Sequence, residues 1–134
     1  MAEDPIESDE RESVYALLQR GQALIRSRHH AQAAIVLERA ARAEPGKGSI
    51  LEPLGRAYHS SGQFDRARDT FEQLLELDPS AHWAHFALAV TLRKLGRGPE
   101  ARTHLRLAVA LCPTSALYRR ALDRVEAASK SDAA

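Results

Sequence analysis

The six histidines of this 134-residue sequence are the side chains best suited to metal chemistry. They are His29, His30, His59, His82, His85 and His104. His82 and His85 stand three residues apart, so on a helix they would face the same way. No carboxylate or cysteine accompanies them at the spacing of a metal site, however. We therefore interpret the histidines as surface or interface residues and predict no metal.

Cys112 is the single cysteine, which excludes an internal disulfide and a zinc site built on cysteines. Its thiol would be reactive beside a Lys or Arg side chain, but an incidental free cysteine is the simpler interpretation. The sequence contains no Walker loop, no dinucleotide-binding fingerprint, no G-x-S-x-G and no H-E-x-x-H. We therefore expect a protein that is not an enzyme, with no catalytic residue, no cofactor and no small-molecule substrate.

Charge is distributed unevenly along the chain, although the formal net charge is only +1. Residues 1–12 contain six acids and one arginine, a net charge of −5. Residues 81–130 contain nine basic residues and three acids, a net charge of +6. We expect the acidic segment to be a solvated tail, and its folding onto the basic third of the chain is the alternative.

The composition favours a helical protein of the cytoplasm. Ala is abundant and aromatic residues make up only 5%, which favours helices over sheets. No run approaches 18 apolar residues, and the first residues lack the basic and apolar regions of a secretory signal. Arg outnumbers Lys by 16 to 3, which hints at a GC-rich bacterial genome. The expected protein is cytoplasmic and bacterial, with no membrane partner.

An internal repeat with a period of about 34 residues organises the chain. Pro45, Pro79 and Pro113 are equally spaced at this period, and each follows a helix-like apolar pattern. A shift by one period superposes small residues on small and large on large at most of the matched positions. The matched sets are Gly21, Gly55 and Ala89; Leu24, Tyr58 and Leu92; Ala33, Ala67 and Ala101; Leu37, Phe71 and Leu105; and Ala40, Leu74 and Ala108. Small residues at fixed places let two antiparallel helices approach closely, and each proline ends the second helix of a pair.

This period and this pattern resemble tetratricopeptide repeats (TPRs) over about residues 14–113. The resemblance implies an all-α fold: a right-handed α-solenoid of three helix-turn-helix repeats with a C-terminal capping helix. We place the TPR domain at 9–129, its repeats at about 14–47, 48–81 and 82–115, and the capping helix at about 115–129. The expected helices are 10–27, 30–43, 50–61, 63–77, 81–95, 99–111 and 115–129, broken near Arg28, Gly62 and Gly96. Residues 1–8 and 130–134 are expected to be disordered tails.

Several local signals refine this expectation. Asp9 with Glu12, and Ser49 with Glu52, have the spacing of capping boxes that would open two of the helices. Pro53 falls inside the first helix of repeat two and should loosen or shift the start of that helix. Gly98-Pro99 replaces the aromatic residue that repeat two has at Phe64. The turn of repeat three should therefore show a shallow notch.

The resemblance also implies where a partner binds, because the first helix of each repeat in this family lines an inner groove. The corresponding residues are Tyr15, Leu18, Gln22 and Ile25; Ser49, Glu52, Arg56 and His59; Trp83, Phe86, Val90 and Arg93; and Leu117, Arg120 and Arg124 of the capping helix. For Trp83 and Phe86, packing in the core is the alternative. One TPR subgroup grips chaperone tails with a clamp of Lys, Asn and Arg, and the clamp positions here hold Leu18, Gln22, Pro53, Trp83 and Ala87. Binding of a chaperone tail is therefore not expected.

The predicted function is that of an adaptor, which binds an acidic, partly apolar segment of another protein in the groove. Trp, Tyr and Arg concentrate binding energy at interfaces, and Arg also binds carboxylates. A self-associating module, a monomer or weak homodimer that buries Trp83 and Phe86 against a second copy, is the first alternative. RNA binding through the basic third is disfavoured, because its arginines are spread over several helices without a known RNA-reading motif.

Overall fold

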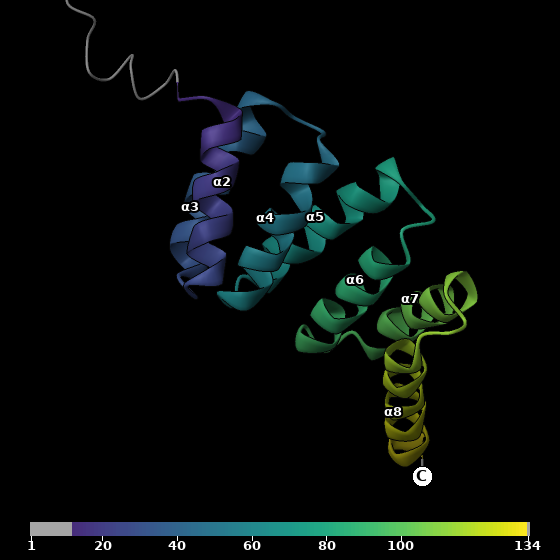
Figure 1. Cartoon of the computed structure of the whole chain (residues 1–134). Coiled ribbons are helices and arrows are strands. Elements are labelled where there is room, and N and C mark those ends of the chain that lie inside the picture. The colour runs from purple at the N-terminus through teal and green to yellow at the C-terminus, as the bar shows by residue number, and fades with distance from the viewer. Residues whose placement is uncertain (1–11, 134) are drawn as a thin grey trace, which may run out of the picture.

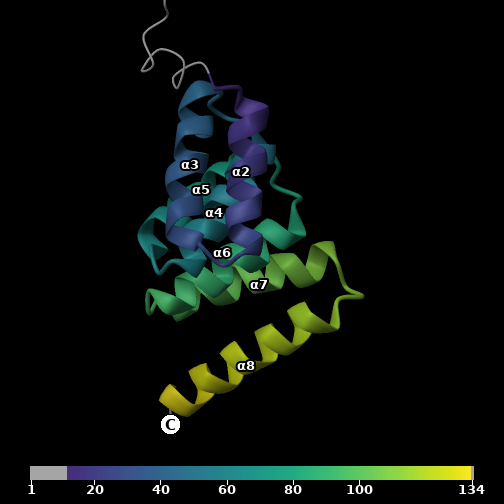
Figure 2. The ribbon, with the colours of Figure 1, turned by 60° about the vertical axis from the view of Figure 1, so that its left-hand side comes forward.

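The computed structural model describes residues 12–133, which form seven helices and, within that range, no strand. The predicted tail at 1–8 and Asp9 lie outside the described residues. The helices are α2 (Val14–Arg26), α3 (His30–Ala43), α4 (Gly48–Ser60), α5 (Phe64–Leu77), α6 (His82–Lys94), α7 (Gly98–Leu111) and α8 (Ala116–Ala133). Successive antiparallel pairs stack from α2/α3 through α4/α5 to α6/α7, and α8 covers the far end (Figures 1 and 2). The prediction of three helical repeats with a capping helix is confirmed.

The turns inside the repeats contain residues with positive φ, at the three places where the sequence predicts breaks. Gly62 and Gly96 have φ of 81° and 73°, a region that glycine enters without steric cost. Arg28 occupies the same place in repeat one with φ of 63°, where a side chain is disfavoured. Each turn reverses the chain, and the second helix then packs back on the first.

The predicted capping box at the start of α2 is wrong, because Glu12 lies before the helix rather than inside it. Ser13 is the N-cap, and its Oγ accepts a hydrogen bond from the Ala16 backbone N–H at 3.0 Å. Glu12 instead pairs with Arg20 at 2.8 Å and with Arg39 at 3.7 Å. The Glu12 carboxylate thus links the residues before α2 to both α2 and α3.

The predicted capping box of Ser49 with Glu52 is also wrong. Helix α4 begins at Gly48, two residues before the predicted start, so Ser49 is already helical. Its N-cap is Lys47, which makes no side-chain capping bond. Pro53 is buried inside α4, and the helix continues through it to Ser60 without a break.

Helix α8 is longer than predicted. It continues to Ala133, so residues 130–133 are helical and the predicted disordered tail does not begin at 130. Its buried face contains Tyr118, Ala121 and Val125, each 6–7% exposed, with Leu122 half-buried beside them. This single apolar stripe packs on the solenoid and leaves the charged residues of α8 outside.

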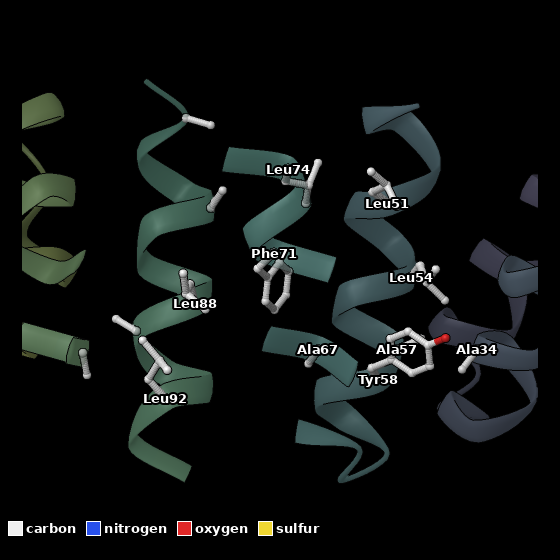
Figure 3. Packing of buried hydrophobic residues seen from close by; sticks show 14 of the residues in the cluster. Ala34, Leu51, Leu54, Ala57, Tyr58, Ala67, Phe71, Leu74, Leu88 and Leu92 are labelled. Carbon is white, nitrogen blue, oxygen red and sulfur yellow. The ribbon is translucent and has the colours of Figure 1, made fainter. Parts of the chain in front are cut away.

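The core lies between the two helices of each repeat and between neighbouring repeats. In Figure 3, Ala67 and Phe71 of α5 lie between the α4 residues around Leu54 and the α6 residues around Leu88. Phe71 is 1% exposed and Ala67 is fully buried. The small positions are small for a steric reason: a Cβ placed on Gly55 would lie 2.6 Å from the Phe71 ring.

Gly55→Ala should therefore destabilise the protein, although alanine is the better helix former. Moving the buried Phe71 ring costs roughly 1–3 kcal/mol, which exceeds the helix-propensity gain of about 1 kcal/mol. We expect a net loss of about 1 kcal/mol in the free energy of unfolding, measured by urea denaturation. Gly48→Ala in the same helix is the matched control, because its Cβ would meet Leu74 at an ordinary 3.7 Å. That control should be neutral or stabilising, and a loss as large as that of Gly55→Ala would contradict the steric argument.

Candidate functional site

The first helices of repeats one and two enclose a hollow between α2 and α4. Its volume is about 500 Å³, and it is lined by Leu18, Gln22, Ile25, Arg26, Ser49, Glu52, Pro53 and Arg56. Six of these residues are among the predicted groove positions. The wall from α2 is apolar at Leu18 and Ile25, and Gln22 between them offers an amide for hydrogen bonding.

A second hollow lies between α4 and α6, the first helices of repeats two and three. Its volume is about 230 Å³, and it is lined by Arg56, His59, Ser60, Phe71, Phe86, Ala87 and Val90. Arg56 borders both hollows, so they form one continuous surface, which we call the inner groove. Its side chain is 63% exposed and lies 3.8 Å from Glu52, a loose pairing that leaves the guanidinium available to a ligand.

His59 is held in one orientation within the inner groove. The hydroxyl of the fully buried Thr91 donates to the Ala87 carbonyl oxygen, so its oxygen accepts from His59 Nδ1–H at 3.1 Å. The His59 ring also meets the Phe64 ring edge-on, with centroids 5.3 Å apart. Burial lowers the pKa of His59, and the charge of Lys94 lowers it further. His59 therefore contributes a neutral, fixed ring to the groove at neutral pH.

Phe86 lies at the boundary between the groove and the core. It lines the second hollow and stacks on Tyr118 of α8, with ring centroids 5.1 Å apart and an interplanar angle of 29°. Both interpretations of Phe86, groove and packing, therefore apply to the same ring. Trp83 is half-buried against the main core cluster and lines neither hollow.

Four other predicted groove residues lie away from the inner groove. Tyr15 is 70% exposed, and its hydroxyl accepts a hydrogen bond from Gln19 at 2.8 Å. Leu117, Arg120 and Arg124 are exposed on α8 and line neither hollow. The groove residues outside the predicted set are Arg26, Pro53, Ser60, Phe71 and Ala87. Arg26 and Ser60 are one period apart and so share one place in the repeat, as do Pro53 and Ala87. The repeat alignment alone therefore shows that the two residues of each pair occupy equivalent places.

Arg93 lines a different hollow, at the turn of repeat three. Its volume is about 320 Å³, and it is lined by Arg93, Gly98, Pro99, Arg102, Val125, Ala128 and Ser129. These residues come from the end of α6, the start of α7 and the second half of α8. The notch predicted from Gly98-Pro99 is thus confirmed, and we keep the name notch for this hollow.

The histidines of repeat three make contacts within the domain; His85 is buried, and His82 and His104 are half-buried. His85 is buried, and the prediction of a surface position is wrong for it. Its Nε2–H donates to the Pro79 carbonyl oxygen at 2.8 Å, and its Nδ1 lies 3.1 Å from His104 Nδ1. His82 Nδ1 bonds the Tyr118 hydroxyl at 2.8 Å. Burial lowers the pKa of His104, and the neighbouring His85 adds to this effect.

The described residues contain no group of three His, Cys, Asp or Glu side chains placed to hold a metal ion. Within the same part of the chain, no helix combines the length and the apolar character needed to span a membrane.

Comparison with known proteins points to one family. A family model described as tetratricopeptide repeat matches residues 18–71 and 52–116. Superkiller complex protein 3 of Mus musculus is 34% identical over 95 residues, which are 71% of this chain and 6% of that protein. The same protein of Homo sapiens is 34% identical over 87 residues, again 6% of its length. The chain thus spans about 6% of the curated relatives it matches.

Solved structures give the same result at the level of the fold. The first TPR of Spaghetti (RPAP3), bound to an HSP90 peptide, has a TM-score of 0.82 at 16% identity and covers 87% of this chain and 93% of its own. A MamA structure from Desulfovibrio magneticus RS-1 has a TM-score of 0.86 at 18% identity, covering 90% and 68%. At such identities the similarity establishes how the helices stack, while function depends on the residues of the groove.

Proposed function

The chain belongs to the tetratricopeptide-repeat family, and we propose that it is a non-catalytic adaptor that binds a segment of another protein in the inner groove. The observation that carries the proposal is the continuity of the two hollows through Arg56. An extended chain or a helix laid along α2, α4 and α6 would contact both hollows at once. The structural relative with an HSP90 peptide supports a protein segment as the class of ligand.

The side chains of the inner groove favour a partner segment that is acidic and partly apolar. Leu18 and Ile25 in one hollow and Phe86 and Val90 in the other offer apolar surface to bulky side chains. The guanidinium of Arg56 between them can bind a carboxylate through two parallel hydrogen bonds. We therefore expect one acidic residue between two apolar anchors.

Binding rather than catalysis also fits the chemistry of the groove. His59 is the histidine that lines the groove, and its Nδ1–H donates a hydrogen bond to the Thr91 hydroxyl oxygen. A catalytic histidine of the triad type is oriented by a carboxylate at that nitrogen. We infer that His59 shapes the groove and does not act as a base.

The test is a selection from a library of random dodecapeptides on the immobilised chain, followed by affinity measurement for the best peptide. We expect the selected peptides to contain acidic residues flanked by bulky apolar ones. Arg56→Glu should weaken the best peptide by tenfold or more, because a repulsive charge replaces an attractive one. Higher salt should weaken wild-type binding in the same direction.

Arg66→Glu is the matched control for this experiment. Arg66 is 65% exposed on α5, the second helix of the repeat. The substitution Arg66→Glu therefore reverses the same charge at a position away from the groove. Both variants should keep the helical signal and melting temperature of the wild type. If Arg66→Glu lost the peptide while Arg56→Glu retained it, the partner would bind the other helix layer and the proposal would be wrong.

A further inference from the structure

Two junctions of the solenoid are built from equivalent positions but have different contents. The first joins repeat two to repeat three, and the second joins repeat three to α8. Residues one period apart occupy the same place in each. His59, Phe64 and Arg68 of the first junction correspond to Arg93, Gly98 and Arg102 of the second, and Thr91, Lys94 and Leu95 correspond to Val125, Ala128 and Ser129. The comparison shows which side chains the second junction lacks.

The first junction is filled by side chains. The Phe64 ring packs edge-on against His59, with ring centroids 5.3 Å apart. His59 also reaches across to the next repeat, where it bonds Thr91 at 3.1 Å. These two contacts tie the turn of repeat two to α6.

The second junction is open because Gly98 replaces the aromatic ring. A Cβ placed on Gly98 would meet no atom within 4 Å, and Gly98 lines the notch at the place that Phe64 holds in the first junction. Val125 and Ala128 of α8 give the resulting notch an apolar wall, and Pro99 adds to it. A hollow of about 370 Å³ also lies at the turn of repeat one, where His30 and Ala31 hold the places of Gly98 and Pro99. Ile25 and Ala34 stand there in place of Arg93 and Arg102, so the notch of repeat three is distinguished by its arginines.

The charges also differ between the two junctions. In the first, Arg68 pairs with Asp65 at 3.4 Å and with Asp69 at 3.2 Å. The corresponding residues of repeat three are Pro99 and Thr103, and neither carries a charge. The two carboxylates that pair with Arg68 thus have no counterpart at the corresponding positions around Arg102.

The notch consequently has two arginines with no acidic partner among the side chains of residues 12–131. Arg102, the counterpart of Arg68, reaches only the Ser129 hydroxyl, at 3.4 Å. Arg93 forms no ion pair within the part of the chain that the structure describes. No Asp or Glu of residues 12–131 lines the notch. The notch is thus a positively charged hollow with an apolar wall.

We propose that the notch binds an organic carboxylate that carries a compact apolar group. The two guanidinium groups supply charge-assisted hydrogen bonds to the carboxylate, and the apolar group packs on Pro99, Val125 and Ala128. The volume of about 320 Å³ is at the small end of ligand sites, so the apolar group is a single aromatic or branched aliphatic one. A free acid and the C-terminal residue of a protein chain present the same chemistry.

The experiment is an NMR titration of the full-length chain labelled with nitrogen-15. The probes are 3-phenylpropionate as a free acid, N-acetyl-L-phenylalanine as a mimic of a chain terminus, and 3-phenylpropanamide as the uncharged analogue. We expect the acids to shift the amide signals of Arg93, Gly98 and Arg102, with a Kd on the order of 1 mM for ligands of this size. Tighter binding of N-acetyl-L-phenylalanine would identify a chain terminus as the source, and tighter binding of 3-phenylpropionate a free acid.

Two kinds of variant test the site itself. Gly98→Phe restores the ring of repeat two and should abolish binding, because the ring fills the notch. Arg93→Gln and Arg102→Gln should each raise Kd by about five- to tenfold, since each removes a charge-assisted bond. Arg119→Gln removes the same charge from an exposed position of α8 outside the notch and should leave Kd unchanged.

The proposal would be overturned by any of three results. These are equal binding of the amide and the acids, no shift of the notch amides with either acid, or unchanged affinity in both Arg93→Gln and Arg102→Gln. The arginine variants change exposed or half-buried groups and keep the test valid even if Gly98→Phe fails to fold. None of these results bears on the inner groove, whose peptide test uses Arg56.

Discussion

Ending the chain after Pro113, which removes α8, is expected to lower the free energy of unfolding by several kcal/mol. Tyr118 and Val125 are each 7% exposed and lie on the apolar stripe that covers the end of the solenoid. Burial of a large side chain contributes roughly 1.5–3 kcal/mol, and the total stability of a domain is about 5–15 kcal/mol. Loss of Tyr118 also removes the ring that stacks on Phe86 and the hydroxyl that bonds His82.

Circular dichroism during heating measures the effect, with light scattering to detect aggregation by the uncovered apolar face. A chain ending after Ala127 is the control, because it keeps Tyr118, Ala121, Leu122 and Val125. We expect this longer chain to melt within a few degrees of the full protein and the shorter one far below it. Similar melting of all three chains would mean that α8 is not needed to cap the solenoid.

The stacking of the helices could be predicted because it repeats. Pro45, Pro79 and Pro113 mark the period, and Ala33, Ala67 and Ala101, which it superposes, are all fully buried. A small residue in a single repeat could have several explanations. A small residue at the same place in all three repeats indicates that the same helix faces pack together in each pair. The period alone also indicates a buried position for His85. His85 lies one period after Leu51 and two periods after Leu17, both buried, so a buried position follows from the alignment.

The ends of the helices could not be predicted equally well, since they depend on competition between neighbouring residues. Asp9, Glu12 and Ser13 are all capable of capping a helix, and only the structure shows that Ser13 does so at α2. At the other end, no Gly or Pro follows Pro113 to stop α8. Ala and Lys near residue 130 are good helix formers, so the helix continues to Ala133.

The predicted groove positions had different outcomes on the repeat helices and on α8. Leu18, Gln22 and Ile25 of α2 line a hollow with Arg56 of α4 as expected. On α8 the buried Tyr118 and Val125 stand one period after the buried Ala84 and Thr91, so the helix keeps the register of the repeat. That register turns Arg120 and Arg124 to the solvent, away from both hollows. Apart from Tyr15, the residues that the resemblance selects on α2 and α4 thus line a hollow, whereas Leu117, Arg120 and Arg124 of α8 line neither hollow.

The packing of small residues between helices leads to the second large effect. Ala67→Leu places three extra carbon atoms at a fully buried position between α5 and its neighbours (Figure 3). Overpacking of this kind costs about 1–3 kcal/mol, and more where the backbone cannot move. We expect the melting temperature to fall by several degrees or more, as measured by circular dichroism. Ala33→Leu and Ala101→Leu should act in the same way, because both residues are also fully buried at the equivalent place.

Arg66→Leu is the control, because it puts the same side chain on the same helix one residue away. Arg66 is 65% exposed, and its contact with Glu38 is a surface ion pair of 3.5 Å worth at most about 1 kcal/mol. Glu38 still accepts the hydrogen bond from the Tyr58 hydroxyl at 2.6 Å after this change. The melting temperature of Arg66→Leu should therefore stay close to that of the wild type. Equal losses for Ala67→Leu and Arg66→Leu would mean that α5 is rotated about its axis, and the small residues would then not set the approach of the helices.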